Sequence, residues 1–227
     1  MKEAPTDAHL RRTFRGSRDA LLQKAIDEPE LGWRVLITLN AFRLLISTTL
    51  LLLFAVESEP RFFGDAKPTL FAASAAGYLV FAILSAISLR QEWVPRAVLA
   101  SAQVLADTIA IVLLMHASGG IESGLGGLLV IFIGAGALVL PVTVSASLAA
   151  LATFAILGEQ AYTQLSSLTV QPNYPAAGIL SAIIFAIALA TQPLARRIRA
   201  TEALARQFGV DLKNLSELNE YIVQHLR

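Results

Sequence analysis

The chain has 227 residues, of which 55% are hydrophobic and 15% are charged, and its formal net charge is +1. Its mean hydropathy of +0.61 is far above that of a soluble globular domain and indicates a polytopic membrane protein. The absence of cysteine excludes a disulfide framework, thiolate chemistry and a cysteine-based metal site.

Residues 1–34 form a basic segment that is predicted to be cytoplasmic. It contains seven Lys or Arg residues and six acidic residues. The basic side chains could contact anionic lipid headgroups, at about 1 kcal/mol for each basic residue near the surface. The interspersed acidic residues favour the simpler interpretation, which is a solvated tail that sets the orientation of the spans.

Six transmembrane helices are predicted to follow, in residues 35–195. The longest window without charge, 123–158, has 36 residues, and one helix of that length would exceed the bilayer core nearly twofold. Pro141 lies near its middle and interrupts a helix, so the window is divided there into two short spans. The expected fold is an all-α membrane protein with spans at about 35–56, 69–89, 96–115, 125–140, 142–157 and 176–194.

The distribution of basic residues predicts that both termini are cytoplasmic. The inner segments hold 15 Lys or Arg residues, whereas the outer segments hold only Arg61 and Lys67. These outer segments, about 57–68, 117–124 and 158–175, are too short to fold into a ligand-binding domain. A stimulus is therefore expected to act within the bilayer, at its surface or from the cytoplasm.

Two ionisable residues, Arg43 and Asp107, lie within predicted spans. Such a residue costs about 2.5–3.5 kcal/mol at the bilayer centre, so it usually has a partner. Counted at about 1.5 Å per residue, Arg43 lies roughly 12 Å deep and Asp107 roughly 15 Å. Asn40 and Gln103 lie one turn nearer the cytoplasm, so the four residues form two polar layers if the first and third spans touch. Arg43 and Asp107 could form an internal ion pair that fixes helix register, or a site that receives a polar group from another membrane helix. In a third interpretation, Arg43 extends to the inner headgroups.

Small residues recur at four-residue spacing along several spans, and this spacing allows helices to approach closely in lipid. The fourth span has glycines near both of its ends, in the segment IESGLGGLLVIFIGAG that begins at Ile121. Internal packing is the simpler interpretation, because Ala-rich spans produce such spacings by chance. The candidates for helix packing or for contact with a second protein are Gly120, Gly124, Gly126 and Gly127.

The sequence lacks recognisable catalytic and cofactor motifs. His9, His116 and His225 lie far apart and do not have the spacing of metal ligands. No phosphate-binding loop or dinucleotide fingerprint is present. We therefore expect no catalytic residue, cofactor or metal in this segment, and no nucleic-acid partner.

Residues 196–227 are predicted to form a cytoplasmic signalling helix with a heptad pattern, interrupted by Asp211 and His225. Such a pattern is typical of a parallel two-stranded coiled coil, which indicates a homodimer. The alternative is one amphipathic helix that packs on a further domain. Pro193 removes a backbone hydrogen bond and could be a hinge or an ordinary helix-end proline. The residues predicted to relay a signal are Pro193, Leu204, Phe208, Leu215, Leu218 and Ile222.

Two segments are distinctive: GGIESGLGGLL at 119–129 and ARRIRATEALARQFGVDLKNLSELNEYIVQHLR at 195–227. Together with six spans and no outer domain, they resemble the N-terminal sensor region of PilS-type sensor histidine kinases, which regulate type IV pili. The resemblance implies that a PAS domain and a dimeric kinase core, which uses ATP and Mg²⁺, follow Arg227. It also implies a bacterial inner-membrane location, a response regulator PilR that controls pilin transcription, and pilin in the membrane as the stimulus.

The sequence leads to the hypothesis that a pilin helix docks in a groove between spans. A pilin helix carries a carboxylate near its N-terminal end, so Arg43 or the glycine-rich face of the fourth span is the expected contact. The alternatives are a small transporter or channel and a membrane scaffold without kinase output. A transporter requires a water-accessible polar path beside Asp107 and Gln103, and this requirement distinguishes it from a sensor and from a scaffold.

Overall fold

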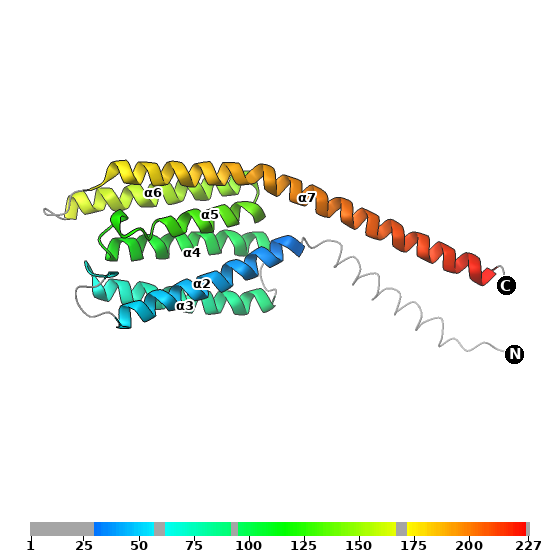
Figure 1. Ribbon diagram of the computed structural model, residues 1–227, viewed down its shortest axis with the longest axis horizontal. Coiled ribbons are helices and arrows are strands. Elements are labelled where there is room, and N and C mark those ends of the chain that lie inside the picture. The colour runs from blue at the N-terminus through cyan, green and yellow to red at the C-terminus, as the bar shows by residue number, and fades with distance from the viewer. Residues whose placement is uncertain (1–29, 57–61, 92–94, 167–171, 226–227) are drawn as a thin grey trace. The chain divides into compact units, whose positions relative to one another are not determined.

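The computed structural model describes residues 30–56, 62–91, 95–166 and 172–225. The bundle comprises Gly32–Arg196, and the part of the last helix that follows Arg196 belongs to a separate unit. All regular elements in the described residues are helical (Figure 1). They are α2 (Glu30–Val56), α3 (Pro68–Gln91), α4 (Arg96–Ala117), the 3-10 helix η1 (Ile121–Ser123), α5 (Gly127–Val139), α6 (Val142–Ser166) and α7 (Tyr174–His225).

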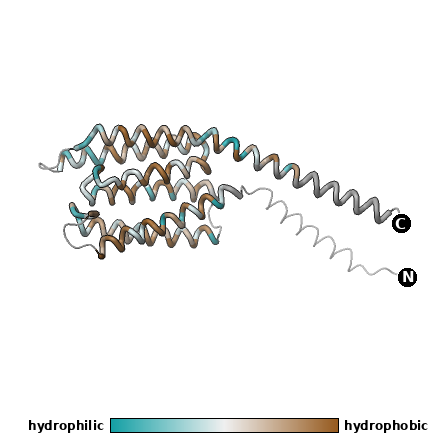
Figure 2. Tube along the Cα trace, in the orientation of Figure 1, coloured by the Kyte–Doolittle hydropathy of each residue, from teal (hydrophilic) through white to brown (hydrophobic). Residues whose placement is uncertain are grey.

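Five helices in the described residues are long and apolar enough to cross a membrane: α2, α3, α4, α6 and the first part of α7. The remaining apolar helix, α5, has only 13 residues, or about 20 Å at 1.5 Å per residue. It lies beside α4, and together with η1 it follows most of the length of that helix (Figure 1). Apolar residues cover most of the bundle helices, and hydrophilic residues gather towards their ends (Figure 2). The chain is therefore a multi-pass membrane protein, as the sequence predicts.

Prolines mark several helix boundaries in the bundle. Pro68 is the first residue of α3, and Pro95 precedes α4 with φ −52° and ψ 133°. Leu140 is extended and Pro141 follows it, so the charge-free window forms two helices. The second of them, α6, ends at Ser166 rather than near 157, and this extension carries the buried Glu159.

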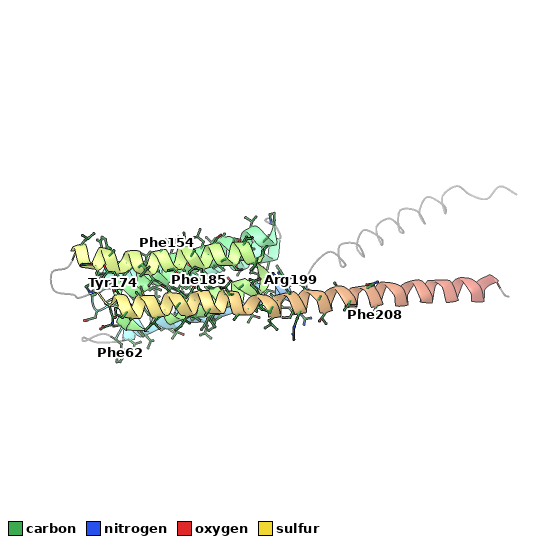
Figure 3. All side chains as sticks on the ribbon, turned by 90° about the horizontal axis from the view of Figure 1, so that it is seen from above. Phe62, Phe154, Tyr174, Phe185, Arg199 and Phe208 are labelled. Atoms are coloured by element: carbon green, nitrogen blue, oxygen red, sulfur yellow. The ribbon has the colours of Figure 1, made fainter. Side chains whose placement is uncertain are left out.

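The last helix, α7, begins at a capped end and is continuous to His225. Asn173 Oδ1 accepts a hydrogen bond from the backbone N–H of Ala176 at 3.1 Å, which satisfies a free donor of the first turn. The helix then continues through Pro193, so the expected boundary between span and tail falls inside one helix. Leu204 is exposed, and so is Phe208 (Figure 3). The side chains of Leu215, Leu218 and Ile222 lie outside the described ones. The coiled coil stays a prediction.

The bundle packs closely where small side chains meet. Ala75, Ala82, Ala149 and Ala152 are fully buried. Large apolar side chains such as Phe154, which is 73% exposed, project from the surface (Figure 3), as lipid-facing residues do. The start of α3, the end of α4, η1, the end of α6 and the start of α7 lie together at one end of the bundle (Figure 1), which we call the His116 end.

Candidate functional site

An ion pair between α2 and α4 lies in the centre of the bundle. Arg43 Nε donates to Asp107 Oδ1 at 2.6 Å, and Arg43 Nη2 donates to Asp107 Oδ2 at 2.6 Å. The two side chains are 0% and 1% exposed. This is the bidentate geometry in which guanidinium and carboxylate match best. The structure therefore brings together the two ionisable residues that the sequence predicts to face each other.

The remaining contacts of Arg43 come from three other side chains. Its Nη1 donates to Asn40 Oδ1 at 3.1 Å, one turn earlier on α2. Its Cζ lies 5.6 Å from the ring centroids of both Phe81, on α3, and Phe132, on α5. Aromatic faces attract a cation most strongly where water is excluded. The guanidinium is thus enclosed within the bundle and does not extend to the headgroup region.

Tyr78 on α3 completes the surroundings of Asp107, because its hydroxyl donates to Asp107 Oδ1 at 2.8 Å. Sequence reasoning missed this residue. Depth along the helix could have found it, since Tyr78 is the eleventh residue of α3 and Asp107 the twelfth of α4. Two antiparallel helices of similar length place such positions near the same level of a membrane. The ion pair therefore links α2, α3, α4 and α5.

The second predicted polar layer is wrong in its pairing. Gln103 Nε2 donates to Ser85 Oγ on α3 at 2.5 Å, whereas Asn40 Oδ1 accepts a hydrogen bond from Arg43. The Gln103 Oε1 atom is buried without a hydrogen-bond partner. The rotation of each helix about its axis thus turns the side chains of Asn40 and Gln103 to different neighbours.

The glycines at the start of α5 divide into three roles. Gly120 and Gly124 have φ of +87° and +73°, so they shape the turns around η1. Gly126 is buried, and a Cβ added there would lie 2.6 Å from Leu180 Cδ2 on α7. Gly127 is exposed and has no heavy atom within 4 Å of an added Cβ. Gly127 alone of these four thus offers an open helix face to another protein.

Helix α5 is tied to α7 along its length. An added Cβ at Gly134 would lie 2.8 Å from Ile187 Cγ2, so the side chain of Ile187 packs on the backbone of α5 at this level, as that of Leu180 does at Gly126. Near the end of α5, Gln192 Nε2 donates to the carbonyl oxygen of Ala137 at 3.2 Å. In an uninterrupted helix that carbonyl would accept from residue 141, but Pro141 has no N–H. Gln192 therefore satisfies a carbonyl that Pro141 leaves free.

An apolar groove of about 400 Å³ lies between α2 and the exposed face of α5. The exposed Gly127 lies one turn before Ile131 on that face. The groove is lined by Arg34, Val35, Thr38, Leu39 and Phe42 from α2 and by Ile131, Ala135 and Leu138 from α5.

A second groove of about 430 Å³ lies between α3 and α4. Small residues line it on both helices, including Ala73 and Gly77 on α3 and Ala106 and Ala110 on α4. Tyr78 lines it as well, although its hydroxyl is already bonded to Asp107. Among the residues that the structure describes, no group of three or more His, Asp or Glu side chains could hold a metal ion.

Comparison with known proteins gives one family and one curated relative. The family of PilS-like transmembrane domains, which have six spans, matches residues 26–205. The sensor protein kinase PilS of Pseudomonas aeruginosa is 35% identical over 200 residues, which are 87% of this chain. The chain spans 37% of the length of that relative. No solved structure matches the chain.

Proposed function

The chain belongs to the PilS-like transmembrane domain family, and we propose that it is the membrane sensing region of a sensor histidine kinase that detects pilin in the bacterial inner membrane. Both termini are cytoplasmic in this proposal. The kinase core of the full-length protein uses ATP and Mg²⁺ and phosphorylates the response regulator PilR, which controls pilin transcription. The residues of the described chain sense and relay, and the chemistry belongs to the kinase core.

The observation that carries the proposal is the contact between α5 and α7. Gly126 packs against Leu180, and Gln192 holds the free carbonyl of Ala137. Helix α7 continues without a break from these contacts to His225. A change in the position of α5 therefore acts directly on the helix that continues beyond the bundle.

The input to this relay is the groove between α2 and α5. Its floor is the exposed face of α5, and Gly126, on the other side of the same helix, contacts α7. Apart from Arg34 and Thr38, the groove is lined by apolar side chains, including the small Ala135, which suits an apolar helix in lipid. Arg43 is bonded to Asp107, so the pilin helix contacts the open face near Gly127 and Ala135 rather than Arg43.

The relay is a shift between two arrangements of a dimer. Pilin changes the output only to the extent that it binds one arrangement more tightly than the other. Pro193 follows the Gln192 tie and removes the N–H that would reach the carbonyl of Leu189, which makes this level a hinge. Unchanged basal and stimulated output in the Pro193→Ala variant of the full-length protein would remove the hinge from the proposal.

The buried ion pair favours a sensor over a transporter. A transported solute needs a polar path that water can enter, whereas Arg43 and Asp107 are enclosed and bonded to each other. Their contacts with four helices suit a rigid core that positions α2 and α5. Labelling of cysteines placed beside Asp107 and Gln103 by a water-soluble thiol reagent would instead support transport.

The experiment that tests the proposal fills each groove in turn. Ala135→Leu narrows the groove between α2 and α5, and Ala106→Leu is the matched control in the groove between α3 and α4. Both variants are made in the full-length kinase, and pilin co-purification and a pilin-promoter reporter are measured. Ala135→Leu is expected to reduce both signals and Ala106→Leu to leave them unchanged. Equal pilin capture by the two variants would contradict docking between α2 and α5.

A further inference from the structure

Three polar side chains form a chain of contacts at the His116 end, away from the central ion pair. Lys67 precedes α3, His116 lies in the last turn of α4, and Glu159 lies on α6. Lys67 Nζ is 2.9 Å from His116 Nε2, and His116 Nδ1 is 2.9 Å from Glu159 Oε1. His116 thus bridges a cation and an anion that belong to two other segments of the bundle.

The partners of Glu159 define it as an acceptor. Its Oε1 accepts from Thr163 Oγ1 at 3.0 Å as well as contacting His116, and its Oε2 accepts from Gln160 Nε2 at 2.5 Å. The side chain is 4% exposed. Hydrogen bonds to a carboxylate are shorter and stronger than those between neutral groups. Glu159 therefore presents an acceptor oxygen, held in place by its other bonds, to the imidazole.

The chemistry of Lys67 fixes the tautomer of His116. An ammonium group has only donors, so the nitrogen that it contacts must accept. Nε2 then carries no hydrogen, and the hydrogen of the neutral ring lies on Nδ1, where it is donated to Glu159. In this arrangement, a neutral His116 joins Lys67 to Glu159.

A proton on Nε2 makes the Lys67 contact repulsive. The imidazolium has a donor on each nitrogen, so two donors and two positive charges would meet at 2.9 Å. Histidine is the side chain whose charge ordinarily changes between pH 5 and 8. The bond to Glu159 gains strength when the ring is charged, so Lys67 moves away. Lys67 is exposed and its Nζ lies 5.7 Å from the ring centroid of Tyr162, so it has room and a further cation contact.

The described segments around His116 carry four further charged or titratable groups besides Lys67 and Glu159. Asp65 precedes α3 in the same segment as Lys67, and Glu122 lies in η1. Tyr162 on α6 packs edge-on to the imidazole at 5.4 Å, and Tyr174 begins α7. Glu122 Oε1 is bonded to Asn173 Nδ2 at 3.4 Å. The groups in contact with the ring are Lys67, Glu159 and Tyr162.

We propose that His116 is a proton-binding site that releases the segment before α3 from the end of α4. Among the described residues, two further bonds join that segment to the end of α4 and to the residue after it: Lys67 N donates to the carbonyl of Ala117 at 3.0 Å, and Gly64 N donates to Ser118 Oγ at 3.1 Å. Both partners directly follow His116 in the chain. Protonation removes the side-chain tie but not these two bonds, so the segment becomes looser on acidification.

The first test observes the tautomer directly. The full chain, with His9→Gln and His225→Gln so that His116 is the sole histidine, is labelled with ¹⁵N-histidine in phosphatidylcholine nanodiscs. The expected spectrum at pH 8 is that of the Nδ1–H tautomer, and acidification to pH 5 adds a proton to Nε2. Lys67→Met is expected to reduce the preference for Nδ1–H at pH 8. An Nε2–H tautomer at pH 8, or no titration down to pH 5, would overturn the proposal.

The second test measures the release. The chain has no cysteine, so spin labels at Ala66→Cys and Gly158→Cys, both exposed positions, report the separation of the segment before α3 from α6. The distance distribution is expected to broaden and lengthen between pH 8 and pH 5.5, with the midpoint of the His116 titration. His116→Gln is the matched control, because an amide bridges Lys67 and Glu159 without titrating, and its distribution should stay constant. A change that persists in His116→Gln, or titration of His116 without a change in distance, would contradict the proposal that protonation of His116 releases the segment before α3.

Discussion

Arg43 and Asp107 are 64 residues apart in sequence and are joined by two hydrogen bonds of 2.6 Å between α2 and α4. The pair is enclosed by Phe81 and Phe132 and bonded to Tyr78 and Asn40. It therefore connects the helix that forms one wall of the α2–α5 groove to the centre of the bundle.

Breaking the pair on one side should destabilise the bundle more than removing both charges. Asp107→Leu leaves a buried, unpaired guanidinium, for which a loss of about 3–5 kcal/mol in the free energy of unfolding is expected. Arg43→Leu combined with Asp107→Leu leaves no charge and should recover most of that loss. Unfolding in mixed micelles, followed by circular dichroism, measures both. The exchange of the two residues, Arg43→Asp with Asp107→Arg, should also restore part of the stability, and equal losses in all these variants would contradict an internal pair.

The neighbouring glycines 126 and 127 should respond in opposite ways to the same substitution. Gly126→Ala places a methyl group 2.6 Å from Leu180 Cδ2, and because this atom is the end of a half-buried, flexible side chain that can shift, a loss of about 1 kcal/mol is expected. Gly127→Ala meets nothing within 4 Å and replaces a flexible residue in a helix, so it should be neutral or stabilising by up to about 1 kcal/mol. The midpoints of thermal unfolding of the two variants, measured in the same detergent, test this difference. A larger loss at position 127 would show that the packing of α5 on α7 has been assigned to the wrong face.

Gln192 is expected to stabilise the contact between α5 and α7, because it bonds the carbonyl of Ala137 that Pro141 leaves free. Gln192→Leu removes its donor and leaves that buried carbonyl unsatisfied, at about 1–3 kcal/mol. Pro141→Ala combined with Gln192→Leu restores an N–H at residue 141, and it should recover part of this loss only if Leu140 changes from its extended to a helical conformation. Hydrogen exchange of the α5 and α7 amides, read by mass spectrometry, should show faster exchange in the single variant. If the single variant exchanges like the parent chain, α5 and α7 are not tied at this level.

The heptad pattern of α7 predicts where two copies of the tail meet. Leu204 and Leu215 lie on the predicted seam, and Arg206 and Lys213 lie on the opposite side of the helix. Because the chain has no cysteine, single cysteines at these four positions can be compared without background. Mild oxidation in membranes should give disulfide-linked dimers at 204 and 215 and little product at 206 and 213. Equal linkage at all four positions would indicate random collision rather than a coiled coil.

The helices and the facing of Arg43 and Asp107 could be predicted from the sequence. Apolar length gives the spans, proline gives the division at 141, and the cost of a charge in lipid requires a partner. The rotation of each helix about its axis could not be predicted, because it depends on how neighbouring surfaces fit together. Gln103 therefore bonds Ser85 instead of reaching Asn40, and Phe132 joins the ion pair without any signal in its own segment.

The His116 end shows a second kind of omission. In the sequence, His116 stands out only as a possible metal ligand without the right spacing, and Glu159 only as the charged residue that follows the charge-free window 123–158. Their proximity follows from topology, since Lys67 precedes one span and His116 and Glu159 lie at or beyond the ends of two others. All three positions meet at the same end of an up-and-down bundle. Comparing the charges at span ends across predicted loops would have found the cluster.

The central claim, that a pilin helix docks between α2 and α5, is tested most directly by photocrosslinking. Benzoylphenylalanine is placed at Ala135, in the groove between α2 and α5, or at Ala106, in the groove between α3 and α4, of the full-length kinase in cells that make pilin. The account predicts a light-dependent crosslink to pilin from position 135 and none from position 106. A crosslink from position 106 alone would move the docking site to the other groove, and the absence of a crosslink from both positions would contradict the account.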